Sequence, residues 1–299
     1  MIIKNINEKY DNIQQEQITK TCFSEAKQMG INPASILRIV PYGSFNYNLS
    51  DEKSDLDLVV VYVPTFLNLF YNYENEKNVI KEQKENKYFG DIIFIDIYNY
   101  LKQVKKGNLR YIETLFSSNI IFEKKFFKKF LDKTRYMYLL HDPEKVQNYI
   151  VGYIDQKAHA LTHPYPSKLD LIKKYGYDLK NYSHVLRMEN FAEKYLILLD
   201  YLYKFGFDVK FLEHKFNPFL IQNNRQEMIN PYYLINLKRH NLIDFPKKEN
   251  VLNHMLKIRR DIKQNEDFET NPFCILFFFK IKKLEEELLE KCFYFVKGI

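Results

Sequence analysis

The stretch of residues 43–63 constrains the fold most, because it joins a small-residue turn to an apolar strand. It begins with Gly43 and Ser44, passes through a short polar spacer, and reaches Asp55 and Asp57 where the apolar run over residues 58–63 begins. Side chains alternate between the two faces of a strand, so both carboxylates point the same way, with Cα atoms roughly 6–7 Å apart. We therefore expect a buried strand over residues 56–63 that holds the two carboxylates rigidly.

Two carboxylates on one face of a strand are suited to binding divalent metal ions. In two-metal phosphoryl transfer the ions lie about 3.5–4 Å apart, one activating the attacking oxygen and one neutralising the departing pyrophosphate. Oxygen ligands favour Mg²⁺ or Mn²⁺ over zinc. Gly43 lets the backbone approach a triphosphate, and Ser44 offers a hydroxyl and adjacent N–H groups. Gly-Ser turns and Asp-rich loops also occur as ordinary connections, but a strand expected over residues 36–40 completes a nucleotidyl-transfer pattern.

Gly-Ser followed by Asp-x-Asp resembles the signature of the DNA polymerase β nucleotidyltransferase superfamily. In particular, the chain is similar to the RNA-ligase-associated predicted nucleotidyltransferases of phages and bacteria. The likeness spans about residues 36–210, and where that group often has a glycine this chain has Asn48, which tolerates left-handed backbone. The later segments that carry the likeness are residues 91–101, Gly107-Asn108, Glu113-Thr114-Leu115-Phe116, and residues 175–180 with His184 and Arg187.

The resemblance implies a third carboxylate, on a strand beside the first two, for the metal on the acceptor side. Asp91 and Asp96 are the candidates, at the two ends of a strand expected over residues 91–97 and on opposite faces of it. Only one of them can face the metals. The family-like spacing to Gly107 favours Asp91, but sequence does not fix the register, so Asp96 stays open. Asp91 could equally be a turn residue, and Asp96 a helix cap.

Lys180, His184 and Arg187 are spaced at i, i+4 and i+7, so they share one face of a helix. Such a row suits the phosphates of an NTP or of a nucleic acid, with Arg giving bidentate contacts and Lys a point charge. A solvated helix face would have the same spacing; the resemblance favours NTP binding. Weaker candidates are Gln156 and Lys157 on the preceding helix, and Tyr42 and Tyr47, which could stack on a base.

The whole pattern predicts an α+β fold, in which a polymerase β-like core with a small mixed sheet flanked by helices precedes a largely helical region. We expect residues 1–122 to form the nucleotidyltransferase core domain and residues 123–299 to form the helical C-terminal domain. Residues 66–70 could form a short helix, and residues 74–87 are a charged stretch that we expect to be mobile. The helix over residues 177–205 is expected to end at Gly206. Helices are expected over residues 13–29, 97–106, 109–116, 142–161, 177–205 and from 272 onward, the last with an apolar stripe of Ile281, Leu284, Leu288 and Cys292.

Composition adds little about partners. The net charge of +7 suits a phosphate-bearing partner, but the Lys-, Asn- and Ile-rich, Trp-free composition typical of an AT-rich coding sequence accounts for it as well. Cys22, Cys274 and Cys292 are too widely spaced to indicate a disulfide framework or a zinc site, so a reducing cytoplasm is expected. The polar start does not resemble a signal peptide, and the longest apolar run, residues 273–279, is too short to cross a membrane.

We therefore expect a metal-dependent nucleotidyltransferase that uses two Mg²⁺ or Mn²⁺ ions. It would transfer NMP from an NTP to an acceptor hydroxyl and release pyrophosphate, and the resemblance implies an RNA or tRNA end as acceptor. The alternatives are a toxin-type nucleotidyltransferase that modifies tRNA or a host protein, and a catalytically silent nucleic-acid-binding module. The identity of the NTP, templating and the oligomeric state stay open.

Overall fold

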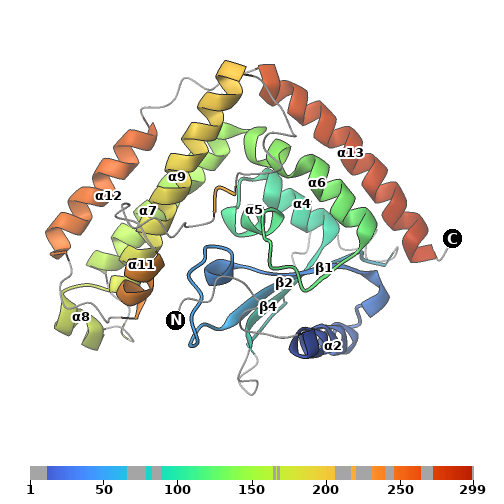
Figure 1. Cartoon of the computed structure of the whole chain (residues 1–299), viewed down its shortest axis with the longest axis horizontal. Coiled ribbons are helices and arrows are strands. Elements are labelled where there is room, and N and C mark those ends of the chain that lie inside the picture. The colour runs from blue at the N-terminus through green and yellow to red at the C-terminus, as the bar shows by residue number, and fades with distance from the viewer. Residues whose placement is uncertain are drawn as a thin grey trace.

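The structure is a computed structural model of the chain. It describes residues 12–65, 79–82, 89–163, 166, 169–205, 217–219, 231–239, 246–263 and 272–297. A sheet with flanking helices forms the N-terminal part, and helices make up the rest (Figure 1).

The sheet is mixed and has five strands in the order β3-β4-β2-β1-β5. β1 is antiparallel to both β2 and β5, β2 is parallel to β4, and β3 is antiparallel to β4. β1 is buried along its whole length because helices cover both faces of the sheet. The strands are β1 (Ile36–Pro41), β2 (Leu56–Tyr62), β3 (Val79–Glu82), β4 (Phe89–Asp96) and β5 (Phe122–Glu123).

Each face of the sheet belongs to its own buried cluster of apolar side chains. On one face, Ile18 and Cys22 of α2 (Asn12–Gln28) pack with Leu58 of β2. On the other face, the sheet packs against α4 (Ile97–Lys105), α5 (Leu109–Leu115) and α6 (Lys125–Leu140), as Figure 1 shows. The site-bearing strands are therefore clamped between two helical layers.

The C-terminal helices form two groups around this core (Figure 1). α9 packs against α7, α11 and α12, and α12 also packs against α7, while α13 lies along α6. In the stripe expected on α13, Ile281, Leu288 and Cys292 are buried and Leu284 is partly buried, as predicted. The helices are α7 (Pro143–Thr162), α8 (Leu169–Tyr175), α9 (Leu179–Phe205), α11 (Pro231–Lys238), α12 (Lys248–Lys263) and α13 (Pro272–Lys297).

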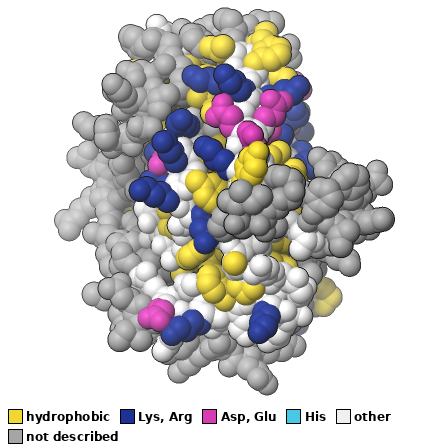
Figure 2. All heavy atoms as spheres, turned by 90° about the vertical axis from the view of Figure 1, so that its right-hand side faces the viewer, with side chains coloured by type: hydrophobic (Ala, Val, Ile, Leu, Met, Phe, Trp, Pro, Cys, Tyr) yellow, Lys and Arg dark blue, Asp and Glu magenta, His cyan; other side chains and the backbone are white. Residues whose placement is uncertain are grey.

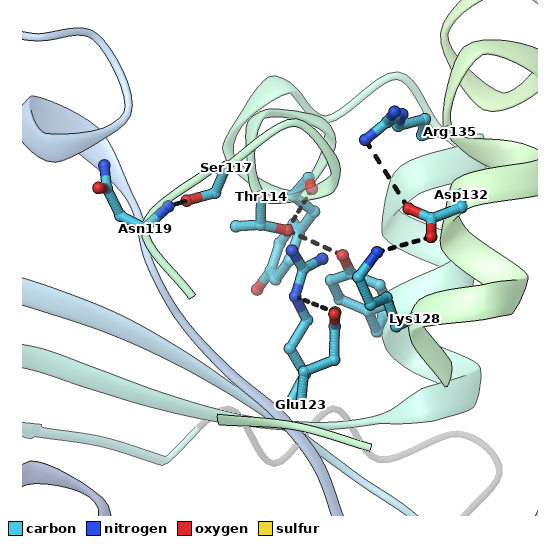
Figure 3. A network of polar contacts seen from close by, with 10 residues as sticks. Thr114, Ser117, Asn119, Glu123, Lys128, Asp132 and Arg135 are labelled. Atoms are coloured by element: carbon cyan, nitrogen blue, oxygen red, sulfur yellow. Dashed lines mark hydrogen bonds and ion pairs between the residues drawn. The ribbon is translucent and has the colours of Figure 1, made fainter. Parts of the chain in front are cut away.

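A buried polar network ties the sheet to α5 (Figure 3). The guanidinium of Arg38 on β1 pairs with Glu123 on β5 at 2.9 Å, and both side chains are almost fully buried. Beside this pair, the hydroxyls of Thr114 and Tyr100 are 2.8 Å apart, and Thr114 also donates to the carbonyl of Tyr111 at 2.6 Å. Removing one partner from such a network leaves a buried charge uncompensated. The network therefore fixes α5, the helix that also carries Glu113.

Figure 2 shows the side of the molecule toward which the C-terminal end of α13 points. Lysine and arginine side chains lie there among acidic and apolar ones, so charges of both signs mix on this face. Near the start of α13, four large apolar side chains are exposed, which are Ile275, Leu276, Phe278 and Phe279. Of the helices that the structure describes, none has both the length and the apolarity needed to cross a membrane.

The predicted fold class is confirmed. β3 lies inside the charged stretch of residues 74–87, where no strand was expected, and β5 was also missed. Gly206, expected to end α9, lies outside the described residues, as does the short helix considered over residues 66–70. The division between residues 122 and 123 stays a prediction, and one buried cluster contains side chains from both sides of it, from Leu37 to Cys292.

Candidate active site

The loop between β1 and β2 contains two residues with left-handed backbone and is held by a hydrogen bond from a later segment. A short 3-10 helix spans Gly43–Phe45, and Gly43 has a φ of +73°, which favours glycine. Asn48 has a φ of +60°, so the prediction that asparagine tolerates left-handed backbone here is confirmed. The amide of Asn119 donates to the carbonyl of Phe45 at 3.1 Å. The loop is therefore held in one shape beside the start of β2.

Glu113 of α5 holds the turn from beneath. Its buried carboxylate accepts a hydrogen bond from the N–H of Gly43 at 2.5 Å and another from the hydroxyl of Tyr47. The guanidinium of Arg187 lies 4.0 Å from the centre of the Tyr47 ring. Burial raises the pKa of Glu113, while Arg187 and the Gly43 N–H oppose that rise. Glu113 thus links the turn to α9, and the Gly43 N–H is committed to this carboxylate.

Asp55 and Asp57 both lie in the wall of a cleft beside this turn, as the alternation predicted. Oδ1 of Asp57 accepts a hydrogen bond from the N–H of Asp91 at 3.0 Å. Burial raises the pKa of Asp57, and the nearby carboxylates of Asp91 and Asp55 raise it further. A Cβ atom on Gly90 would lie only 2.1 Å from that Oδ1, so glycine is required there. Asp57 is therefore near enough to Asp55 and Asp91 to be repelled by both charges at this end of the sheet, although Asp91 is not among the residues that line the cleft.

Asp96 lies at the other end of β4. In the parallel pairing, Leu56 is opposite Phe89 and Tyr62 is opposite Asp96. Oδ1 of Asp96 accepts the N–H of Asn99 at 2.9 Å and so caps α4. The alternative that Asp96 is a helix cap is confirmed, and of the two candidates for a third carboxylate the structure brings Asp91, not Asp96, to Asp57.

The cleft has a volume of about 500 Å³, within the range of small-molecule sites. The β1–β2 loop and β2 supply carboxylates and are called the acidic wall, and α7, α9 and α11 supply cations and are called the cationic wall. α5 contributes further lining residues. All the residues that the sequence predicted for NTP binding line this cleft, and so do the weaker candidates. They are Gly43, Ser44, Lys180, His184 and Arg187, and then Tyr42, Tyr47, Gln156 and Lys157.

The α9 residues share the cleft but differ in state. Burial, followed by the charge of Arg187 and then of Lys157, lowers the pKa of His184 well below its usual value, so its imidazole is neutral at pH 7. Arg187 packs on Tyr47 and is hydrogen bonded to Tyr153, whereas Lys180 is exposed. Arg187 is therefore partly engaged with its own chain, and Lys180 is the α9 cation most available to a ligand.

Sequence reasoning missed two cations at the C-terminal end of α11, Lys238 in its last position and Arg239 directly after it. Nζ of Lys238 donates to Oγ of Ser44 at 3.2 Å. Arg239 makes a two-pronged ion pair with Asp51, from Nε at 2.9 Å and from the terminal nitrogen at 2.7 Å. The only signal was a basic pair at the end of a short helix, which is common in proteins. Other lining residues that were not predicted are Lys53, Ser54, Leu109, Arg110, Glu113, Tyr149, Tyr153 and Met188.

The carboxylates at the sheet end fit a hard divalent cation. Their mutual repulsion contributes to the raised pKa of Asp57, and a cation would relieve it. Within the described part of the chain, no three His, Cys, Asp or Glu side chains are already gathered into a metal-binding group. Mg²⁺ is often bound by one or two carboxylates together with substrate phosphates. The site therefore fits a cation that arrives with a polyphosphate.

A family model described as a nucleotidyltransferase domain matches residues 22–127, which include the Gly43 turn, Asp55, Asp57 and Asp91. No curated protein sequence matches the chain significantly. Residues 22–127 thus form a nucleotidyltransferase domain, and the prediction that the chain is a nucleotidyltransferase is confirmed. The match covers neither α7 nor the helices after it, so the RNA-ligase-associated group and the acceptor stay predictions.

Proposed function

We propose that this protein transfers NMP from an NTP to an acceptor hydroxyl, an RNA or tRNA end, in a reaction that depends on a divalent cation. One observation carries the proposal: carboxylates at the start of β2 and cations from the later helices line the same cleft. A nucleotide needs both walls, because its triphosphate is anionic and its reacting phosphorus has to be brought to the carboxylates.

Asp55 and Asp57 would hold the cation, with Asp91 as the third carboxylate. A bound divalent cation would neutralise charge on the polyphosphate and promote ionisation of the acceptor hydroxyl. The neighbouring carboxylates already raise the pKa of Asp57, which supports this assignment. Gly90 and the N–H of Asp91 fix the orientation of the Asp57 carboxylate.

The chain's own residues would orient the triphosphate. Ser44 lines the cleft, and so do Lys157 on α7 and Lys180 on α9. In the transfer, a bond forms between the acceptor oxygen and the α-phosphorus. The bond between the α-phosphorus and the oxygen that bridges it to the β-phosphorus breaks. The hydroxyl proton passes to the carboxylates at the sheet end, and the cations offset the charge on the departing pyrophosphate.

An RNA acceptor rests on the resemblance and on the charge of the cleft. Lys157 and Lys180 are joined there by Lys53 and Arg110, which gives more cationic groups than one triphosphate requires. The cationic groups that the triphosphate does not contact could bind the phosphates of an RNA strand. These cationic groups together would repel an acceptor rich in Lys and Arg.

The test is incubation of the purified protein with each labelled NTP and Mg²⁺ or Mn²⁺, with total RNA in one set and lysate proteins in another. We expect label in RNA for the wild type and none for Asp57→Asn. Label in protein would contradict an RNA acceptor and support the toxin-type nucleotidyltransferase that modifies a protein. Equal behaviour of wild type and Asp57→Asn in every set would overturn the enzymatic proposal and leave the silent binding module.

Asp91→Asn and Asp96→Asn form a matched pair for the third carboxylate. Both residues lie on β4, but only Asp91 adjoins Asp57. We expect Asp91→Asn to lower kcat about 10²-fold or more, since it alters charge at the reacting centre. Asp96→Asn should leave kcat unchanged, because asparagine also caps a helix and the side chain lies away from Asp57. The reverse pattern would return the role to Asp96.

A further inference from the structure

The end of α11 rests on the loop that carries the Gly43–Ser44 turn, although α11 lies outside residues 22–127. Lys238 reaches Oγ of Ser44 at 3.2 Å, and the next residue, Arg239, pairs with Asp51 in the same loop. The last residue of α11 and the residue that follows it thus contact the two ends of the segment between Ser44 and Asp51. Nothing in the matched family assigns a role to either of them.

The two contacts differ in their electrostatic balance. Burial alone would raise the pKa of Asp51, but hydrogen bonds from Arg239 and Ser54 lower it to about 2. This ion pair is therefore satisfied. Lys238 is half-buried, and its hydrogen bond within the described part of the chain goes to a neutral group, the hydroxyl of Ser44. Burial, followed by the charge of Arg239, lowers its pKa to about 8, with Lys180 and Arg187 adding to the repulsion and Asp51 opposing it.

A cation held in a cleft among other cations is costly to the folded protein unless an anion joins it. Lys238 lines the cleft together with Ser44, Lys180 and Arg187. Its amino group donates to the hydroxyl that is the predicted phosphate contact in the Gly-Ser turn. A phosphate group placed at Ser44 would meet Lys238 directly and balance its charge.

Building on the proposed function, we infer that Lys238 binds the triphosphate of the NTP at Ser44, and that Arg239 is a positioning residue that sets Lys238 over the turn through Asp51. The C-terminal helical region then supplies part of the nucleotide site itself. A purely structural role for Lys238 would predict a loss of stability on truncation, with unchanged phosphate binding.

The first test measures binding of inorganic tripolyphosphate with Mg²⁺ by calorimetry, since this probe has no base and needs no transfer reaction. We expect Lys238→Ala to weaken binding about tenfold, the loss of one charge-assisted hydrogen bond, and Lys238→Arg to keep most of it. Lys247→Ala, at an exposed lysine just before α12, is the matched control and should bind as the wild type does. Wild-type affinity in Lys238→Ala would overturn the inference.

The second test concerns positioning. Arg239→Ala and Asp51→Asn should each weaken tripolyphosphate binding, and the double variant Lys238→Ala/Arg239→Ala should be no weaker than Lys238→Ala alone. Additive losses would show that Arg239 binds phosphate itself and would overturn its positioning role. Thermal unfolding of each variant separates lost affinity from lost folding.

The outcome also separates this inference from the proposed function. If the wild type binds tripolyphosphate through Lys238 but transfers no NMP to any acceptor, the inference stands and the proposed function fails. If NMP is transferred but Lys238→Ala changes neither tripolyphosphate binding nor the KM for NTP, the proposed function stands and the inference fails.

Discussion

The two walls of the cleft are built in different ways. The acidic wall comes from neighbouring strands, and its carboxylates are fixed by the backbone: Asp91 donates its N–H to Asp57, and Gly90 leaves room for that carboxylate. The cationic wall comes from the side chains of three separate helices, α7, α9 and α11, whose charges repel one another. The carboxylates of the acidic wall are thus held in place before any ligand binds. The cations of the cationic wall repel one another, so a bound polyanion would stabilise them.

The largest expected effect comes from Gly90→Ala, because an added methyl group beside Asp57 should move its carboxylate out of position. The added Cβ would lie 2.1 Å from Oδ1 of Asp57 and would displace the carboxylate. We expect kcat/KM for NMP transfer to fall about 10²-fold or more, as for a misplaced catalytic group. The matched control is Gly152→Ala on α7, where nothing lies within 4 Å of the added atom. It should keep full activity and gain up to about 1 kcal/mol of stability. Full activity in Gly90→Ala would contradict an acidic wall whose carboxylates are held in place.

Glu113 is the point where the two walls join. Glu113→Ala would leave the Gly43 N–H without its acceptor and the half-buried Arg187 without its nearby carboxylate. We expect the free energy of unfolding to fall by about 3–5 kcal/mol, measured by denaturant titration. Glu113→Gln keeps an acceptor for Gly43 and should lose less. Glu286→Ala, at an exposed position on α13, is the control and should change stability by less than about 0.5 kcal/mol. Equal losses in both Glu113 variants would show that charge, not the acceptor, dominates.

Removing one cation from the cationic wall should weaken NTP binding only moderately, because other cations remain. Lys180 is exposed and lines the cleft, so Lys180→Ala should raise the KM for NTP about 3- to 10-fold and change kcat little. Lys173→Ala on α8, also exposed but outside the cleft lining, should leave both constants unchanged. Loss of kcat as large as in Gly90→Ala would remove the distinction between the walls.

The smallest effect concerns α12, which braces α9 behind the cationic wall. His254 on α12 pairs with Glu189 on α9 at 2.9 Å, and this hydrogen bond raises the pKa of His254 above 6.5. A raised pKa in the folded state gives stability that is complete below pH 6.5 and is lost as the pH rises through the folded pKa. Because the pair is partly exposed, we expect less than about 1 kcal/mol. Thermal unfolding across pH 5.5–8.5 should show this loss in the wild type and not in Glu189→Gln. An identical pH dependence in both would exclude the pair as its cause.

The acidic wall could be predicted because its chemistry is local in sequence. A turn, a spacer and an alternating strand determine where Asp55 and Asp57 point, whatever the rest of the chain does. The family-like spacing favoured Asp91 over Asp96, but sequence could not settle the choice, because it depends on how β4 pairs with β2. β3 and β5 were missed because short edge strands carry too few residues to show alternation.

The cationic wall could be predicted only where helical spacing gathers its members. Lys180, His184 and Arg187 show that spacing, and all three line the cleft. Lys238 and Arg239 reach the turn through tertiary packing of a short helix, for which sequence carries no periodic signal. Glu113 was noticed as part of a family-like segment, but its bond to Gly43 depends on how α5 sits against the β1–β2 loop.

The central claim is that both walls hold one nucleotide, with the acidic wall acting through a divalent cation. The most direct test is calorimetric binding of a non-hydrolysable NTP analogue with and without Mg²⁺, in the wild type, Asp57→Asn and Lys180→Ala. We predict that Mg²⁺ tightens binding in the wild type and in Lys180→Ala but not in Asp57→Asn, and that Lys180→Ala binds more weakly under both conditions. Equal tightening by Mg²⁺ in Asp57→Asn and the wild type would contradict the account.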